Sequence, residues 1–214
     1  ERLTGLVALN VVADPNLPTP APGEPLVDPM RVFSVDLQGD VTPLFIPQYR
    51  DFFGENVSLT SVVRSRANGR ILLDQLLLQT AHFGIKGELS IEPECMPDRF
   101  NFDISMVSPD KSPVLLPLPG VETRLQEARL VAQYDQSLGD SWSLRGRING
   151  FERETLKFET ADLDGSGEIL LGERPSATAK IHADVMGIET TDEGLRDALS
   201  DSANFDARQS HVCT

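Results

Sequence analysis

Apolar and polar side chains alternate one by one along most of this 214-residue chain, and this period of two restricts its fold most strongly. In the stretch RFNFDISMV, Phe100, Phe102, Ile104 and Met106 are separated by single polar residues. A β-strand points successive side chains to opposite faces, so such a strand has one apolar and one polar face. This arrangement is typical of antiparallel sheets. The alternation recurs in residues 3–11, 33–37, 83–91, 130–134, 142–148 and 177–185.

Turn signals separate these segments. Asn68-Gly69 lies between two β-prone runs, a pairing that favours a tight hairpin turn. SLGD at 137–140 and GER at 172–174 are further turn candidates. We therefore predict a mainly β fold: a long antiparallel meander of roughly eight to eleven strands. Residues 1–201 are expected to form a single β-rich region.

Three segments interrupt the alternation. Residues 13–29 are rich in proline, which predicts a stiff, extended surface connector. Residues 42–54 favour one or two short helices, with Thr42 as N-cap, Pro43 in the first turn and Gly54 as the stop. A capping box from Thr190 to Glu193 predicts a third short helix near 191–200. The tail at 202–214 is expected to be unstructured.

The acidic composition narrows the possible partners. The formal net charge is −14, and such a surface repels nucleic acid and anionic headgroups. No run of about 18 apolar residues is long enough to span a bilayer. Because the chain begins within an alternating segment and without Met, we interpret it as an interior piece of a longer protein. Cys95 and Cys213 fit no metal-binding or redox spacing, and their redox state stays open.

The stretch DLDGSGEILLGE, residues 162–173, imitates a calcium-binding EF-hand loop. Asp162, Asp164, Ser166 and Glu173 occupy ligand positions of that loop. An EF-hand also needs a helix on each side, and Pro175 would break the second one. We therefore predict a strand with a bulge and no metal site. The alternative that stays open is an extracellular or periplasmic β-sheet binding module with a calcium site at 162–173.

An enzymatic function is not favoured. Ser141 in GDSWSL could be a nucleophile, but the motif lacks the second glycine of a nucleophile elbow. His82, His182 and His211 are predicted to lie at a turn, on the polar face of a strand and in the tail. Nothing in the pattern brings them together, and no phosphate-binding glycine loop occurs. We predict neither a catalytic residue nor a cofactor.

The apolar face of such a meander must be covered. Its side chains can pack against one another in an ordinary core, inside a barrel or a sandwich. They can instead line an open trough that holds an apolar ligand. Burying an acyl chain contributes about 0.8 kcal/mol per methylene, so a partly dry trough could hold a lipid tail.

Several motifs resemble the TamB family, the translocation and assembly module proteins of the AsmA-like superfamily, in their alphaproteobacterial form. These are PQYRDFFG before a strand, LLDQLLLQTAHFGIKGELSI as a hairpin, PVLLPLPG before a long strand, YDQSLGDSWSL, and GI followed by TDEGLRDAL. The resemblance covers most of residues 39–201. The family's membrane anchor and its carboxy-terminal conserved domain are missing, consistent with an interior fragment.

The resemblance implies an open, U-shaped β-trough (a β-taco) in a periplasmic protein whose full-length form is tethered to the inner membrane. The implied role is non-catalytic envelope biogenesis: outer-membrane protein assembly, protein secretion, lipid transport between the membranes, or several of these. The implied partners are a TamA-like outer-membrane barrel protein and, as cargo, phospholipid acyl chains or nascent outer-membrane β-strands. The predicted lipid-lining residues are Phe83, Ile85, Leu89, Ile91, Phe100, Phe102, Ile104, Leu130, Tyr134, Trp142, Leu144, Ile148, Leu156, Phe158 and Ile181.

Overall fold

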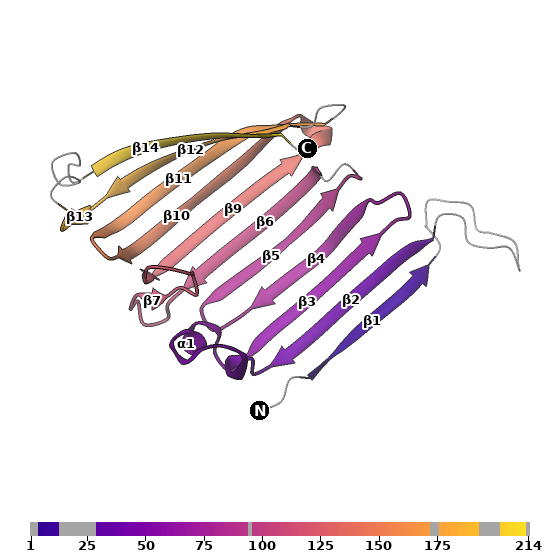
Figure 1. Ribbon diagram of the computed structural model, residues 1–214, viewed down its shortest axis with the longest axis horizontal. Helices are drawn as coiled ribbons and strands as arrows, with labels where there is room; N and C mark the ends of the chain where they lie inside the picture. Colours follow the sequence, from indigo (N-terminus) through magenta and orange to yellow (C-terminus); the bar gives the residue numbers. More distant parts are fainter. Residues whose placement is uncertain (1–3, 13–28, 94–95, 172–175, 193–201, 213–214) are drawn as a thin grey trace, which may run out of the picture.

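One antiparallel sheet forms nearly all of the described protein (Figure 1). The computed structural model describes residues 4–12, 29–93, 96–171, 176–192 and, for the backbone alone, 202–212. Its main path runs β1-β2-β3-β4-β5-β6-β9-β10-β11-β12-β14. These strands are β1 Thr4–Val12, β2 Met30–Gly39, β3 Val57–Ser65, β4 Ile71–Gln79, β5 Phe83–Ile91, β6 Pro97–Val107, β9 Glu127–Asp135, β10 Ser141–Arg153, β11 Leu156–Leu170, β12 Ser176–Met186 and β14 Ser202–Val212.

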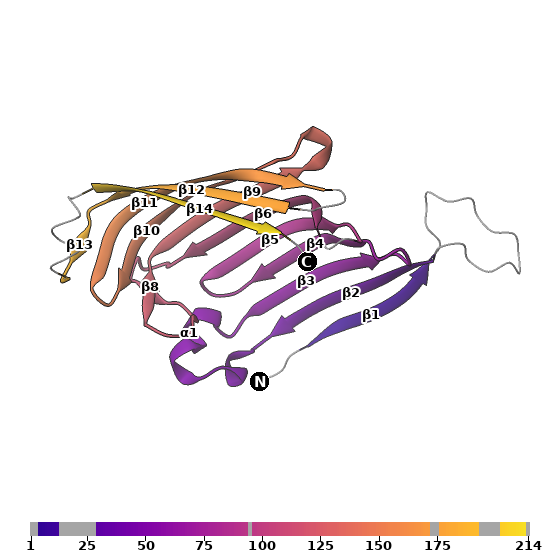
Figure 2. The same ribbon diagram turned by 45° about the horizontal axis from the view of Figure 1, so that its top comes forward.

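The predicted antiparallel meander is confirmed, because the strands of the main path pair with one another in the order of the chain. The sheet is neither closed nor strongly curled, however, whereas the sequence predicted a U-shaped trough (Figure 2). A β-bulge bends the strand that contains it and increases the local twist. Among the described strand pairs, register shifts occur in the β3–β4, β4–β5 and β5–β6 pairs, so most of the sheet keeps a regular ladder.

A short helical segment follows β2. It contains two 3-10 turns, Thr42–Leu44 and Pro47–Tyr49, and the single-turn helix α1, Arg50–Phe53, which ends at Gly54 with φ +68°. The helical prediction for this segment is confirmed, but the predicted cap is wrong. The N-cap is Val41, which makes no side-chain capping bond, while Asp40 just before it accepts from the Thr42 backbone N–H at 2.9 Å and the Thr42 hydroxyl at 2.6 Å.

Three short strands and a 3-10 turn lie outside the main path of the sheet. The short strands β7, Val114–Leu115, and β8, Thr123–Leu125, pair with each other, and β8 also pairs with β10. β13, Glu189–Thr190, pairs with β11, and a 3-10 turn at Gln136–Leu138 links β9 to β10. The proline-rich connector, the turn at 172–174 and the helix predicted near 191–200 fall mainly outside the described residues.

The C-terminal segment differs from the prediction. Instead of an unstructured tail, Ser202–Val212 form β14, which pairs with β12 from Met186 opposite Ser202 to Ser176 opposite Val212. The free edge of β12 offers a row of backbone donors and acceptors, and pairing satisfies them whatever the side chains are. Backbone pairing of this kind leaves little trace in a hydrophobicity pattern.

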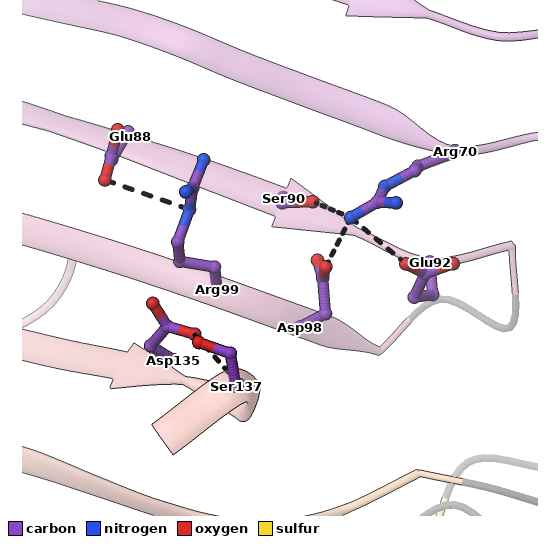
Figure 3. A network of polar contacts seen from close by, with 8 residues as sticks. All are labelled: Arg70, Glu88, Ser90, Glu92, Asp98, Arg99, Asp135 and Ser137. Carbon is purple, nitrogen blue, oxygen red and sulfur yellow. Dashed lines mark hydrogen bonds and ion pairs between the residues drawn. The ribbon is translucent and has the colours of Figure 1, made fainter. Parts of the chain in front are cut away.

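Arg70 forms a cluster of polar contacts at one end of the sheet. It follows the predicted Asn68-Gly69 turn and reaches over β5 (Figure 3). Its Nη2 donates to the Ser90 hydroxyl at 3.2 Å and pairs with Asp98 at 2.5 Å and Glu92 at 3.3 Å. The guanidinium thereby ties the β3–β4 hairpin to β5 and β6. Arg70 directly precedes β4, Ser90 belongs to β5, Glu92 follows β5 and Asp98 belongs to β6, so these contacts link three neighbouring strands.

Candidate functional site

The strand register gathers the apolar side chains on one face. Directly opposed residues in an antiparallel ladder share a face. Phe102 lies opposite Gly87 on β5 and Ala132 on β9, and Ala132 lies opposite Leu144 on β10. We call this side of the sheet the apolar face and the side that carries Asp103 the polar face. Twelve of the fifteen predicted lining residues, all except Ile91, Leu156 and Phe158, follow directly from these rows on β5, β6, β9, β10 and β12.

The three other predicted lining residues lie at irregular places. Ile91 pairs with Ile71, in line with Leu89 and Leu73, although its register to β6 is shifted. Phe158 stacks on Phe151, with ring centroids 4.6 Å apart. Leu156 is two residues before Phe158 on the same strand and therefore alternates onto the same side.

Two glycines with positive φ lie close to Phe151 and Phe158, where the alternation of side chains changes. Residues an odd number of positions apart on a regular strand point to opposite faces. Phe151 is three residues after Ile148, yet both side chains pack against the same buried cluster. Gly150 lies between them with φ +62°, and Gly187 on β12's continuation has φ +66°. Positive φ is available to glycine at no steric cost. The apolar residues of β11 change parity at the same place, from Phe158 to Ala161, although the register of β11 to β10 shows no shift.

The apolar face extends further than the sequence predicted. On β1 and β2 it carries Val7, Leu9, Val35 and Leu37, and on β3 and β4 it carries Leu59, Val63, Leu73, Leu76 and Leu78. The alternation of 33–37 contained this signal, but the run ILLDQLLLQ on β4 hid it, because leucine occupies both parities there. The bulge between Leu73 and Leu76 assigns the leucines to their faces.

Much of the apolar face is open. Leu9 is 68% exposed, Phe33 42% and Ile181 36%, whereas Tyr134 and Met106 are nearly fully buried. The exposed residues lie toward the two outer edges of the sheet, and no described element forms a second layer over the face (Figure 1). Large exposed apolar patches on soluble proteins usually mark an interaction site.

In the middle of the sheet, the apolar face is covered at both ends of the strands. At one end Phe52 of α1 and Leu125 of β8 form a buried cluster with Met106 and Ala128. At the other end Met96, Tyr134 and Ile169 form a second cluster, against which Phe100 and Trp142 pack. Burial raises the pKa of the Tyr134 hydroxyl, which donates to the Ile169 carbonyl at 3.3 Å. The clusters leave an apolar surface that runs across the strands between two closed ends.

Residues 162–170 of the EF-hand-like stretch are part of strand β11, so the prediction of a strand is confirmed for them, whereas the predicted bulge is absent from the register of β11 to β10 and β12. Its glycines serve the apolar face. The Trp142 indole crosses β11 and donates to the Thr178 carbonyl at 2.8 Å. A Cβ at Gly167 would lie 1.9 Å from that carbonyl oxygen and 2.6 Å from the indole nitrogen, so only glycine leaves room for the contact.

The acids of the same stretch face the other way and pair with arginines. Asp162 accepts from the Arg147 Nε at 2.6 Å, and Asp164 lies 3.6 Å from the Arg145 Nε. These hydrogen bonds from Arg147 lower the pKa of the Asp162 carboxyl. Glu173 lies outside the described residues, and within them no cluster of three or more potential ligands could hold a metal ion. Cys95 and Cys213 also lie outside them.

Opposed charges cover the polar face more widely. Lys86 on β5 pairs with Asp103 on β6 at 3.1 Å, and Arg64 on β3 pairs with Asp74 on β4 at 2.9 Å. Exposed pairs of this kind contribute little stability individually. These charges keep the polar face in contact with water. A slip of the register by one residue would exchange the two faces, so the separation into a polar and an apolar face fixes the strand register.

The candidate catalytic residues do not come together. His82 contacts the Val107 carbonyl at 3.1 Å, at one end of β6. Ser141 begins β10 near the opposite end, where Arg99 of β6 lies opposite Asp135. His182 is on the polar face of β12, 3.3 Å from Asp184. His211 is in β14, where only the backbone is described. None of the described helices is long and apolar enough to cross a membrane.

Comparisons with protein-family models, with curated proteins and with solved structures find no match. The functional argument therefore depends on the geometry of the apolar face.

Proposed function

We propose that the protein is a non-catalytic component of envelope biogenesis that shields apolar cargo on the apolar face of its sheet. The observation that carries this proposal is the apolar surface that extends from β1 to β12 with Ser61 of β3 as a small polar interruption, open in its outer parts and backed by a charged face. A phospholipid matches this arrangement, since its tails need an apolar surface while its headgroup stays in water.

The energetics favour acyl chains as cargo. Each fully buried methylene contributes about 0.8 kcal/mol, so contact along one side of a chain still gives several kcal/mol in total. Cargo lying across the strands, along the row of opposed residues from Val7 of β1 to Ile181 of β12, would meet no charged side chain. In this proposal the sheet curls toward the U-shaped trough when cargo is bound, which would cover the tails more completely.

The cellular setting that we propose follows the TamB-like motifs. The full-length protein would be periplasmic, tethered to the inner membrane, and would act with a TamA-like outer-membrane barrel protein. Its cargo would be phospholipid in transit between the membranes, and nascent outer-membrane β-strands could use the same face. An extended strand with alternating side chains presents an apolar side similar in chemistry to an acyl chain.

The test compares the two faces. Delipidated protein is incubated with a phospholipid carrying a radiolabelled acyl chain, and bound lipid is measured after gel filtration. We expect uptake by the unsubstituted chain and loss of uptake in the double variant Phe102→Asp with Ile104→Asp. The matched control, Leu77→Asp with Val131→Asp, places two carboxylates on the polar face, where these side chains are 48% and 38% exposed, and should retain uptake.

Unfolding is the main alternative cause of lost uptake, so circular dichroism accompanies each variant. A further variant, Leu9→Asp, changes a side chain that is 68% exposed and should reduce uptake with little change in the melting temperature. Equal loss from the polar-face pair, or no uptake by the unsubstituted chain, would reject the proposal. A calcium titration tests the remaining alternative: heat that disappears in Asp162→Ala would favour the calcium-binding module.

A further inference from the structure

Two stretches without a charged residue lie together at the end of the sheet that carries α1 and β7 (Figure 1). One is VTPLFIPQY, residues 41–49, which leads into α1, and the other is SPVLLPLPGV, residues 112–121, which contains β7. The Tyr49 hydroxyl donates to the Leu118 carbonyl at 3.3 Å and joins the two stretches, which we call the uncharged loops. Because 24% of the chain is charged, two such stretches side by side form a distinct surface.

The uncharged loops expose large apolar side chains. Leu44 is 78% exposed, Ile46 55% and Leu118 49%. The Phe45 ring stacks on Phe53 of α1, with ring centroids 3.7 Å apart, so the first loop is held against the helix. Exposed apolar side chains that lie close together usually mark a contact surface.

Many backbone groups of the uncharged loops are satisfied within the loops themselves. In the first loop three backbone N–H groups donate to carbonyls of the same loop, Leu44 to Val41, Phe45 to Thr42 and Tyr49 to Ile46. In the second loop the Leu118 N–H donates to the Leu116 carbonyl at 2.8 Å. The prolines at 43, 47, 117 and 119 have no N–H to satisfy. A loop in water can leave such groups to the solvent, whereas a surface that enters a bilayer must satisfy them internally.

We propose that the uncharged loops dock the protein on the surface of a lipid bilayer, with Leu44, Ile46 and Leu118 entering the boundary between headgroups and acyl chains. Apolar side chains that project from loops can each enter a fluid bilayer without a matching pocket. Tyr49 suits the same boundary, because its ring is apolar and its hydroxyl is polar. Docking is separate from cargo binding, but it would bring the apolar face close to a source of phospholipid.

Charge indicates which bilayer fits. The residues that directly border the uncharged loops are two acids, Asp40 and Glu122, and two bases, Arg50 and Lys111. This border is balanced, whereas the whole chain has a net charge of −14 and is repelled by anionic lipid. We therefore expect docking on zwitterionic lipid. Because it depends on apolar contact, it should persist at high salt.

Cosedimentation with sucrose-loaded phosphatidylcholine vesicles tests the docking. The unsubstituted chain should bind, and the triple variant Leu44→Ser, Ile46→Ser, Leu118→Ser should bind at least about tenfold more weakly, since it loses the apolar groups that enter the bilayer. The matched control is Leu138→Ser. Leu138 is 88% exposed, but it lies in the 3-10 turn between β9 and β10, at the opposite ends of the strands, so this variant should bind normally.

The cargo-binding variant separates docking from the proposed function. Phe102→Asp with Ile104→Asp should lose phospholipid uptake and still sediment with vesicles, and circular dichroism excludes unfolding in every variant. The inference is overturned if the unsubstituted chain does not bind the vesicles, or if the triple variant binds them equally well. It is also overturned if Leu138→Ser weakens binding as much as the triple variant does. Loss of vesicle binding in the cargo-binding variant would likewise reject it, because contact would then occur through the apolar face.

Discussion

At single positions, the choice of residue determines how a side chain can cross from one strand of the sheet to another. Trp142 is the clearest case, since its ring belongs to the apolar face while its indole N–H crosses β11 to bond the Thr178 carbonyl at 2.8 Å. Gly167 permits that crossing. The acidic, glycine-rich stretch therefore resembles a metal-binding loop in sequence only. Its glycines leave room for neighbouring side chains on one face, and its aspartates form ion pairs with arginines on the other.

Gly167→Ala should destabilise the protein by about 2 kcal/mol, because the new Cβ would displace either the Thr178 carbonyl or the indole. The comparison variant is Gly165→Ala, whose Cβ would lie 3.0 Å from the Leu144 Cβ and should cost about 1 kcal/mol or less. Urea unfolding measures both. Equal costs would mean that the crossing at Gly167 does not determine the effect.

At the scale of elements, the helix α1 and the strand β8 close one end of the apolar face. Phe52 is the residue of α1 that enters this cluster, and it is 6% exposed. The helix is a single turn and cannot be stable alone, so its packing must hold it in place. Phe53 packs against the same cluster, so two neighbouring aromatic side chains of α1 contribute to this closed end.

Phe52→Ala should cost about 3 kcal/mol, the usual effect of removing a buried aromatic ring. Leu44, in the same segment, is 78% exposed, and Leu44→Ala should change stability by no more than about 0.5 kcal/mol. The midpoints of denaturant unfolding curves give both values. A cost for Leu44→Ala similar to that for Phe52→Ala would show that the segment is held by other contacts.

Elements also show how far the sequence could predict the fold. Strands such as β6 and β10 were predictable, because each buries one side against neighbours and the pattern records it. β4 was only partly predictable, since leucines at both parities need a bulge to assign them. β14 was predicted as an unstructured tail, because pairing at an edge uses backbone groups common to every residue. The closed ends of the apolar face depend on contacts distant in sequence, such as Phe52 with Leu125.

For the whole molecule, the separation into two faces matters more than any single pocket. A net charge of −14 and the ion pairs of the polar face keep one side in water, while the apolar side has only its ends covered. That arrangement is costly for a protein that binds nothing, because exposed apolar surface promotes aggregation. The cargo-shielding role that we propose would cover this exposed apolar surface.

Quenching of tryptophan fluorescence tests this central claim most directly. Trp142 is the only tryptophan in the chain, and it lies on the apolar face. Phospholipid with brominated acyl chains quenches an indole only at close range, so the same lipid without bromine is the control. If acyl chains lie on the apolar face, the brominated lipid will quench Trp142 and the Phe102→Asp, Ile104→Asp variant will not be quenched. Equal fluorescence with both lipids, in protein shown to have bound them, would contradict the account.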